Sequence, residues 1–419
     1  MPTIELKYGS EKIPFNYDAG QFDVLGGGSA APPLTDIEIG ERLEDPIGSP
    51  TLSELVQPGR SVLFVVPDAT RQAAAGQIVN LVTRRLIADG VMPFDISIIF
   101  ATGIHRPVTL AEKEEILTPF IAQRVKTLDH SPRDLMQIVR VGETSGSIPI
   151  ELNRALMQYD HVITIGSVAY HYFAGFTGGR KLLTPGLAGS RTIAATHKLA
   201  FDCETKDRRE GVGTGLMDGN PVHEAFEECA AKIENVFAIN TLLSEEGNLN
   251  GLYCGDRRAS HRAACDTYDA EHNVELREKR DLVIVDAGGS PHDINLIQAQ
   301  KSLDAAASAC KPGGTIIFLA ACPDGLGRSD FMKWFEFGNS SSLAERLCDG
   351  YEVNGQTAWT LLKKAESFDI QIACSLAEDD VAKMGMRKID DLKRTLEQSD
   401  GAGTGYIIPS ASKYRFTLT

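Results

Sequence analysis

The sequence lacks a cysteine pair at C-x-x-C spacing, and it lacks an apolar run of about 18 residues, the length that a membrane-spanning helix needs. Its eight cysteines are scattered, most of them in apolar or helical contexts. This pattern is typical of reduced, partly buried thiols. The first residues also show no basic-then-apolar leader. We therefore expect a cytoplasmic protein with no membrane contact.

Positive charge is also in short supply. Lys and Arg total 42 against 57 Asp and Glu, which gives a net charge of −15. A chain of this charge is a poor ligand for a phosphate backbone, so nucleic acid is not expected as a partner. A small anionic substrate stays possible, because local cations such as Arg71, Arg180 and Lys181 act at short range.

Several familiar catalytic motifs are missing. The chain has no Walker A sequence, no H-E-x-x-H and no G-x-S-x-G, and no glycine fingerprint stands between a buried strand and a helix. These absences remove the main support for kinase, zincin, serine hydrolase and nicotinamide dehydrogenase functions.

Buried-strand and helix patterns alternate along the 419 residues. Apolar runs at 61–66, 95–100 and 161–165, and again at 235–243, 281–286, 314–321 and 368–373, are separated by helical patterns such as 73–89. This order predicts an α/β protein of two domains, each with a mainly parallel sheet flanked by helices and with the active site in the cleft between them. We expect a domain over residues 1–270, rejoined by 396–419, and a second over 275–395; the polar segment 256–280 carries the chain across.

Reactive residues follow the first three predicted strands. Asp68, Thr70 and Arg71 come after the first, His105 after the second and His171 after the third. Ligands bind outside the carboxyl ends of parallel strands, so a site is expected here. A single loop histidine more often hydrogen-bonds backbone, but two at neighbouring strand ends favour a pair of acid/base groups.

The segment 171–197 adds further reactive groups around a glycine-rich bend. Lys181 directly follows Gly178, Gly179 and Arg180, and fits either a covalent anchor for a cofactor or an ordinary phosphate-binding or exposed lysine. His197 shares a helix face with Ile193 and fits either a metal ligand or a hydrogen-bonded core histidine.

The second domain offers fewer candidates. Gln298 and Lys301 lie one helical turn apart after a strand and a glycine turn, placed to close on a ligand or simply to face solvent. Arg71 can hold a carboxylate in a bidentate fork, and Asp68 can orient Arg71 or Lys181; a surface ion pair is the plain alternative.

Taken together, these residues resemble the nickel-dependent lactate racemases and related 2-hydroxyacid racemases. The resemblance covers most of the chain. It runs through Asp68-x-Thr70-Arg71, Gly103-Ile104-His105-Arg106-Pro107, the 171–197 segment, Gly219-Asn220-Pro221-Val222-His223 and Gln298-x-x-Lys301.

The resemblance implies a racemase that interconverts D- and L-2-hydroxy acids. Its implied cofactor is nickel held by pyridinium-3-thioamide-5-thiocarboxylic acid mononucleotide, a pincer nucleotide linked to Lys181 and made by separate maturation enzymes. His197 would be the protein's nickel ligand. Hydride would move from the substrate carbon to the cofactor and back, with a 2-keto acid between.

Roles for the remaining residues follow from the same resemblance. His105 and His171 would be the acid/base pair. Arg71, Gln298 and Lys301 would bind the substrate. Cofactor contacts would come from Asp68, Thr70, Gly178, Gly179, Arg180 and Trp359.

The match departs from the lactate enzyme at Ile297, where that enzyme has a tyrosine near the substrate, so the pocket could suit a different 2-hydroxy acid. Two other classes fit the same residues: a metal-dependent hydrolase with His105, His171 and His197 as ligands, and a non-catalytic two-domain protein that binds an anion.

Overall fold

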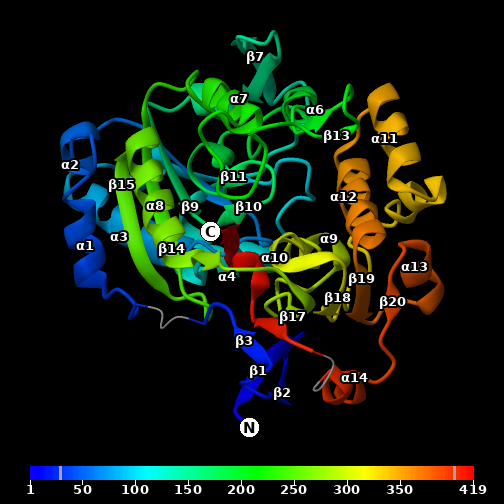
Figure 1. The fold of residues 1–419 in the computed structure, drawn as a ribbon. Coiled ribbons are helices and arrows are strands. Elements are labelled where there is room, and N and C mark those ends of the chain that lie inside the picture. Colours follow the sequence, from blue (N-terminus) through cyan, green and yellow to red (C-terminus); the bar gives the residue numbers. More distant parts are fainter. Residues whose placement is uncertain (28–30, 400–402) are drawn as a thin grey trace. The chain divides into compact units, whose positions relative to one another are not determined.

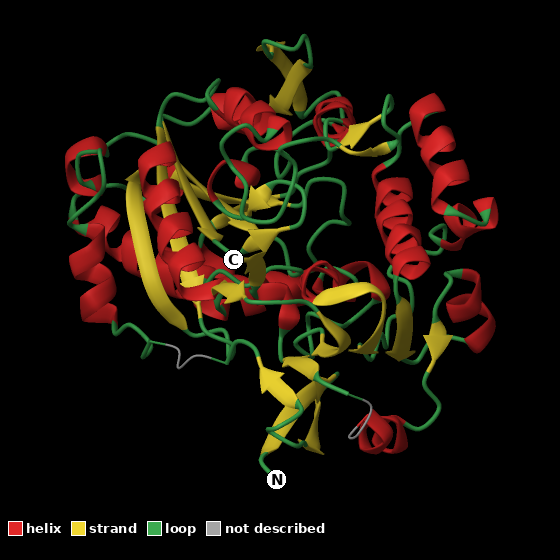
Figure 2. Ribbon diagram, viewed as in Figure 1, coloured by secondary structure: helices red, strands yellow, loops and turns green. Residues whose placement is uncertain are grey.

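The computed structural model describes residues 1–27, 31–399 and 403–419. The chain forms two compact units. Unit 1 comprises Met1–Gly28, Phe201–Arg209 and Glu271–Thr419, and unit 2 comprises Ser29–Ala200 and Glu210–Ala270. In both units helices flank strands (Figures 1 and 2), so the predicted α/β class is confirmed.

The elements of unit 2 are α1 (Asp36–Leu43), α2 (Leu52–Leu55), β4 (Val62–Pro67), α3 (Ala75–Ala88), β5 (Ile96–Ala101), α4 (Leu110–Leu117), α5 (Pro119–Arg124), β6 (Lys126–Leu128), β7 (Ile138–Glu143), β8 (Pro149–Asn153), β9 (His161–Ser167), β10 (Tyr170–His171), β11 (Gly175–Phe176), α6 (Ser190–Lys198), α7 (Pro221–Ala230), β14 (Val236–Leu243), β15 (Leu249–Asp256) and α8 (Arg257–His272), with short 3-10 helices η1 (Pro93–Asp95), η2 (Arg154–Met157) and η3 (Gly179–Leu182).

The main sheet of unit 2 has the strand order β15-β14-β9-β4-β5-β6, parallel except for the β14–β15 pair. Alternate residues of β4 enter different cores because successive side chains of a strand point to opposite faces. Val62 and Phe64 pack with α3, whereas Leu63 and Val65 pack with the segment that contains η3 and α6. Apolar cover on both faces explains the continuous apolar runs in the sequence.

The elements of unit 1 are β1 (Thr3–Tyr8), β2 (Glu11–Asn16), β3 (Phe22–Val24), β12 (Phe201–Asp202), β13 (Asp207–Arg208), β16 (Asn273–Leu276), β17 (Arg280–Asp286), α9 (Leu296–Ala299), α10 (Ser302–Ala309), β18 (Cys310–Leu319), η4 (Met332–Phe337), α11 (Ser340–Asp349), α12 (Val353–Ser367), β19 (Asp369–Ala373), α13 (Glu378–Lys383), β20 (Arg387–Lys388), α14 (Leu392–Ser399), β21 (Gly405–Ile408), η5 (Ala411–Lys413) and β22 (Arg415–Leu418).

The main sheet of unit 1 is parallel throughout, in the order β20-β19-β18-β17-β21-β3. One face packs on α10, α11 and α12, and the other packs on the β1–β2 hairpin and α14. None of the described helices is both long enough and apolar enough to cross a membrane.

The units differ from the predicted domains at both ends of the sequence and at residues 201–209, which also belong to unit 1. The first 28 residues belong to unit 1, because β3 pairs with β21 at the edge of that sheet. The tail at 396–419, which we expected to rejoin residues 1–270, instead supplies β21 beside β17 and β22 beside β16. Residues 400–402 of that tail lie outside the described chain.

One cysteine pair contradicts the expectation of reduced thiols. The β12–β13 hairpin belongs to unit 1, and Cys203 in its turn forms a disulfide with Cys348 near the end of α11. Their Cα atoms are 5.6 Å apart, a separation that spacing in the sequence could not reveal. The six free cysteines among the described residues are all buried, as expected.

Candidate active site

His105 and Asp68 form a short polar contact in the candidate site. His105 Nδ1 lies 2.6 Å from Asp68 Oδ2. Asp68 follows β4 and His105 follows β5, and these strands are neighbours in the sheet. The other oxygen, Oδ1, accepts hydrogen bonds from the Thr70 hydroxyl at 2.6 Å and the Thr70 amide at 3.0 Å. Besides the predicted interaction with Arg71, in which the charge of Asp68 opposes the lowering of the Arg71 pKa by desolvation, the structure shows Asp68 holding His105.

The charge state of Asp68 determines the tautomer of His105. Burial alone would raise the pKa of Asp68, but the hydrogen bonds and charge of His105, together with Thr70, lower it overall. An ionised carboxylate can only accept, so His105 must donate from Nδ1. In the neutral ring the lone pair then sits on Nε2, and half of the side chain is exposed. His105 is thus set up as a base.

His171 lies at the end of the third strand-loop segment, in the short strand β10, and is buried. Its Nδ1 accepts long hydrogen bonds from the amides of Ala174 at 3.3 Å and Phe173 at 3.5 Å. The ring stacks on Tyr172 and meets Phe173 edge to face, at centroid distances of 5.2 and 4.4 Å. The two amide contacts favour a proton on Nε2, although their length makes the preference weak.

Lys181 and His197 share two aromatic neighbours. Lys181 Nζ lies 5.6 Å from the ring centre of Phe173 and 5.9 Å from that of Phe226. The His197 ring lies 5.2 and 5.6 Å from the same two rings. Lys181 comes from η3, His197 from α6 and Phe226 from α7. The structure therefore brings together two predicted residues from different elements.

His197 is held as a neutral imidazole. Its Nδ1 lies 2.7 Å from the carbonyl oxygen of Ile193, one turn back in α6, which acts as acceptor. Burial lowers the pKa of His197 to about 4, and the positive charge of Lys181 adds to the effect. With Nδ1 as the donor, the lone pair is on Nε2, the form in which histidine binds a metal.

Arg71 follows Asp68 at the end of β4 and is exposed. Its amide donates to the carbonyl oxygen of Asp68 at 3.1 Å. The next residue, Gln72, accepts a hydrogen bond from Ser167 at the end of β9 at 2.6 Å. These contacts fix the backbone of the Arg71 loop at the carboxyl edge of the sheet. Desolvation lowers the pKa of Arg71, and the charge of Asp68 opposes that effect.

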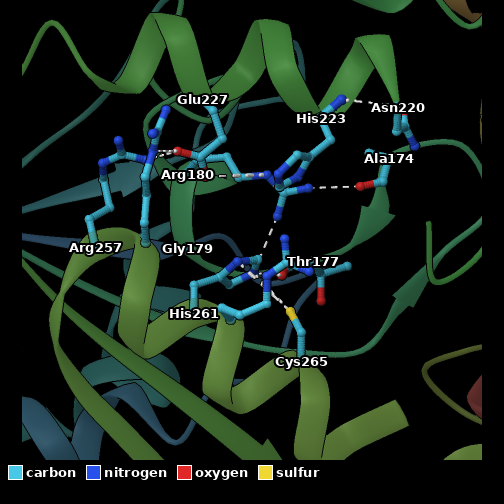
Figure 3. A network of polar contacts seen from close by, with 12 residues as sticks. Ala174, Thr177, Gly179, Arg180, Asn220, His223, Glu227, Arg257, His261 and Cys265 are labelled. Carbon is cyan, nitrogen blue, oxygen red and sulfur yellow. Dashed lines mark hydrogen bonds and ion pairs between the residues drawn. The ribbon is translucent and has the colours of Figure 1, made fainter. Parts of the chain in front are cut away.

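Arg180, which we expected to contact the cofactor, has a fully buried side chain bound by other residues of unit 2 (Figure 3). It donates to the carbonyl oxygen of Ala174 at 2.7 Å, lies 3.2 Å from His261 Nε2 and has Glu227 Oε1 at 4.0 Å. Burial lowers its pKa to about 10, and the Glu227 carboxylate opposes that effect. Glu227 also binds Arg257. Arg180 therefore holds the loop that precedes Lys181 through contacts made in the protein interior.

The two glycines before Arg180 are explained by close packing. A side chain at Gly179 would place its Cβ 2.6 Å from the His261 ring, and the Gly179 amide already donates to Asn240 Oδ1 at 3.1 Å. At Gly178 a Cβ would lie 3.0 Å from the carbonyl oxygen of Ser167. Both have positive φ, so the bend needs glycine whatever the ligand.

Gln298, Lys301 and Trp359 belong to unit 1. Lys301 Nζ donates to Gln298 Oε1, in agreement with their predicted spacing of one turn, although the predicted helix is broken into α9 and α10 at this point. Trp359 in α12 is buried and meets Phe201 edge to face at 5.0 Å, with Lys363 Nζ 5.2 Å from its ring centre.

Four residues around the candidate site were not among the predicted site residues, namely Phe173, Phe226, Glu227 and His261. No sequence motif contains them as functional positions, because they are ordinary helix and loop residues. The alternation of apolar and charged positions in α7 is the one sequence signal that could have indicated them. Among residues 1–27, 31–399 and 403–419, no three His, Cys, Asp or Glu side chains are grouped to hold a metal. The hydrolase alternative, which needs His105, His171 and His197 as joint ligands, therefore loses its basis.

Comparisons with known proteins identify the family of this chain. The family model described as "Lactate racemase N-terminal domain" matches residues 8–208, and "Lactate racemase C-terminal domain" matches residues 276–401. The lactate racemase of Thermoanaerobacterium thermosaccharolyticum is 28% identical over 80% of this chain and 78% of its own. That of Lactiplantibacillus plantarum is 33% identical over 69% of this chain and 66% of its own.

Solved structures agree on the fold. The lactate racemase apoprotein of Thermoanaerobacterium thermosaccharolyticum superposes with a TM-score of 0.89 at 24% identity, over 99% of this chain and 100% of the other. A protein from Thermotoga maritima gives 0.72 at 22% identity, over 94% and 100%. Sequence and fold together define an α/β isomerase of the racemase class. The chain belongs to the lactate racemase family.

Proposed function

We propose that this enzyme racemises a 2-hydroxy acid, lactate or a close relative, with a nickel pincer nucleotide linked to Lys181. The observation that carries the proposal is the meeting of Lys181 with a neutral His197 between the same two aromatic rings. A lysine and a metal-binding imidazole are the two groups that such a cofactor needs from the protein. His197 fits because its hydrogen bond to Ile193 keeps Nε2 unprotonated.

When bound, the cofactor would accept a hydride from the substrate carbon and return it. The protein's own task is to move the hydroxyl proton and to hold the substrate. His105 suits the first task, since Asp68 fixes its tautomer and stabilises the imidazolium that forms when Nε2 takes a proton. His171 would serve the opposite face of the substrate.

A turnover begins with one of the two histidines neutral and the other protonated, and it ends with these two states exchanged. The neutral ring takes the hydroxyl proton, and the protonated ring gives one to the oxygen when the other enantiomer forms. The long amide contacts at His171 Nδ1 are weak enough to be given up when that ring becomes an imidazolium.

Substrate binding is assigned to Arg71, Gln298 and Lys301. The guanidinium of Arg71 can hold a carboxylate through two hydrogen bonds. Lys301 and Gln298, already joined to each other, offer a cation and an amide for the carboxylate or the carbonyl oxygen. Half-buried Ile297, next to this pair, gives the substrate an apolar neighbour.

The test is to produce the protein together with the cofactor-maturation enzymes and to measure intact mass and metal content. We expect a covalent adduct on Lys181 and about one nickel per chain, both absent from Lys181→Ala and both present in the control Lys198→Ala. A Lys181→Ala protein that still carries adduct and nickel would rule out the assigned role of Lys181.

A second test addresses the histidines. The His105→Ala, His171→Ala double variant should take up adduct and nickel but lose racemisation of D- and L-lactate. Persistent racemisation would overturn the acid/base assignment. If the wild-type protein binds 2-hydroxy acids without racemising them when loaded, it is an anion-binding protein instead.

A further inference from the structure

Phe173 contacts three groups of the proposed site with a single ring. It meets His171 edge to face at 4.4 Å and His197 at 5.2 Å, and Lys181 Nζ lies 5.6 Å from its centre. Phe226 approaches from α7 and repeats two of these contacts, at 5.6 Å to His197 and 5.9 Å to Lys181. The lysine amine and the imidazole are thus bordered by the same pair of rings.

Both phenylalanines are rigidly held. Phe226 is fully buried, Phe173 is 5% exposed, and they belong to one small apolar cluster with Ala174, Val222 and others. Asn220, which caps α7, donates its side-chain amide to the carbonyl oxygen of Phe173 at 3.0 Å. The next carbonyl, of Ala174, accepts from buried Arg180. Neither ring can swing away without breaking a buried hydrogen bond or leaving the cluster.

Each contact restricts the group it touches. An aromatic face attracts an ammonium within about 6 Å of its centre, so two faces limit the directions that Lys181 Nζ can take. An edge-to-face contact with Phe173 and a tilted contact with Phe226 likewise limit rotation of the His197 ring, whose Nδ1 is already bound to Ile193. The same two rings therefore restrict both the amine and the imidazole.

We infer that Phe173 and Phe226 form an aromatic clamp that positions Lys181 and His197 for the cofactor before it arrives. They are positioning residues, and the inference rests on the proposed function. The buried ion network drawn in Figure 3 is joined to both rings through the backbone: Arg180 binds the carbonyl oxygen of Ala174, next to Phe173, and Glu227 follows Phe226 in α7.

The test uses Phe226→Leu and Phe173→Leu, which keep an apolar side chain but remove the ring. In apo protein at one fixed pH, the rate of Lys181 acylation is measured by peptide mass spectrometry. We expect it to rise about two- to fivefold, since that is the factor a cation–π contact is worth. In protein produced with the maturation enzymes, nickel per adduct should fall several-fold while the adduct still forms.

The matched control is Phe237→Leu, which removes an equally buried ring from a different core of unit 2. It should lower the melting temperature but leave acylation and nickel per adduct unchanged, which separates positioning from general loosening. If Phe226→Leu does not fold, Phe226→Met keeps more side-chain volume and serves in its place.

The acylation rates and the nickel-to-adduct ratios together decide whether the clamp exists. Acylation rates and nickel-to-adduct ratios within twofold of wild type in both clamp variants would overturn the clamp. If wild-type protein acquires no adduct at all, the proposed function fails, and the acylation rates of the apo variants still decide whether the clamp exists.

Discussion

The contact between Asp68 and His105 determines which nitrogen of the imidazole can act as a base, because the buried carboxylate accepts a hydrogen bond from Nδ1 and leaves the lone pair on Nε2. Replacing Asp68 by Asn removes the fixed acceptor and lets the amide donate to Nδ1, which moves the ring proton to Nε2. We expect racemisation by loaded enzyme to fall by about 10²- to 10⁴-fold, the usual range for loss of a positioned base. Adduct and nickel content should not change.

The control for this prediction is Thr70→Val, which removes the hydroxyl bond to Asp68 and keeps the one to His105. Its rate should stay within tenfold of wild type. A rate within threefold for Asp68→Asn itself would show that His105 does not depend on this carboxylate.

At the residue scale, the sequence indicated the reactive groups but not their partners. Asp68, His105, Lys181 and His197 stand where strand ends and a glycine bend predicted chemistry. The pairing of Asp68 with His105 depends on the neighbouring positions of β4 and β5, which no local pattern encodes. The burial of Arg180 could not be predicted from local sequence either, because its counterion Glu227 comes from α7, which is distant in the chain.

At the scale of elements, the β12–β13 hairpin is attached to unit 1 by more than its disulfide. Asp207 pairs with Lys363 of α12, and Arg208 lies 3.3 Å from Asp304 of α10. Cleavage of the Cys203–Cys348 bond should therefore loosen the hairpin without releasing it entirely.

We expect reduction with dithiothreitol to lower the free energy of unfolding by up to about 5 kcal/mol, the upper end for a cross-link over a long loop. Urea unfolding with and without reductant measures this. Limited proteolysis should show faster cleavage within residues 203–210. The Cys203→Ser, Cys348→Ser variant should behave like the reduced protein and ignore the reductant; equal stability of all forms would show that the bond adds nothing.

The strands were predicted well because each is a continuous apolar run between turns. β4, β5, β9, β14, β17, β18 and β19 all lie on predicted segments. Elements with short or polar sequences were not predicted. The polar segment after β15 forms α8, whose His261 packs against Gly179, and strands β12 and β13 have only two residues each. Their positions come from tertiary contacts, which outweigh local preference.

At the scale of the whole molecule, the two units carry buried groups of opposite pH response. Burial lowers the pKa of His130 and His197 to about 4 and that of His223 and His261 to about 3, all in unit 2. In the unfolded chain these histidines take up protons near pH 6.5, whereas in the folded unit they stay neutral at that pH. Acidification below pH 6.5 therefore lowers the free energy of unfolding of unit 2.

Asp286 in unit 1 has the opposite effect on the pH dependence of stability. Burial raises its pKa to about 6, although hydrogen bonds from the amides of Ser410, Lys7 and Gly288 oppose the effect. The folded state then binds a proton that the unfolded state lacks between about pH 4 and 6. Its stabilising contribution is present at acid pH and lost as pH rises through 6.

Unfolding at pH 7.5 and pH 5.0 should separate these responses. Both tryptophans, Trp334 and Trp359, lie in unit 1, so their fluorescence reports that unit while far-ultraviolet circular dichroism reports both. On acidification we expect the dichroism midpoint to fall and the fluorescence midpoint to hold or rise. Asp286→Asn should abolish any rise. Equal downward shifts by both probes would contradict the assignment.

The four crossings of the chain between units, after residues 28, 200, 209 and 270, have a consequence for synthesis. Unit 2 can complete its fold once residue 270 has left the ribosome. Strand β3 is made before unit 2, and its partner β21 is made only after unit 2 and the rest of the unit 1 sheet. The edge strand therefore stays unpaired while residues 25–404 are synthesised, and neither unit corresponds to one uninterrupted stretch of the sequence that could be expressed alone.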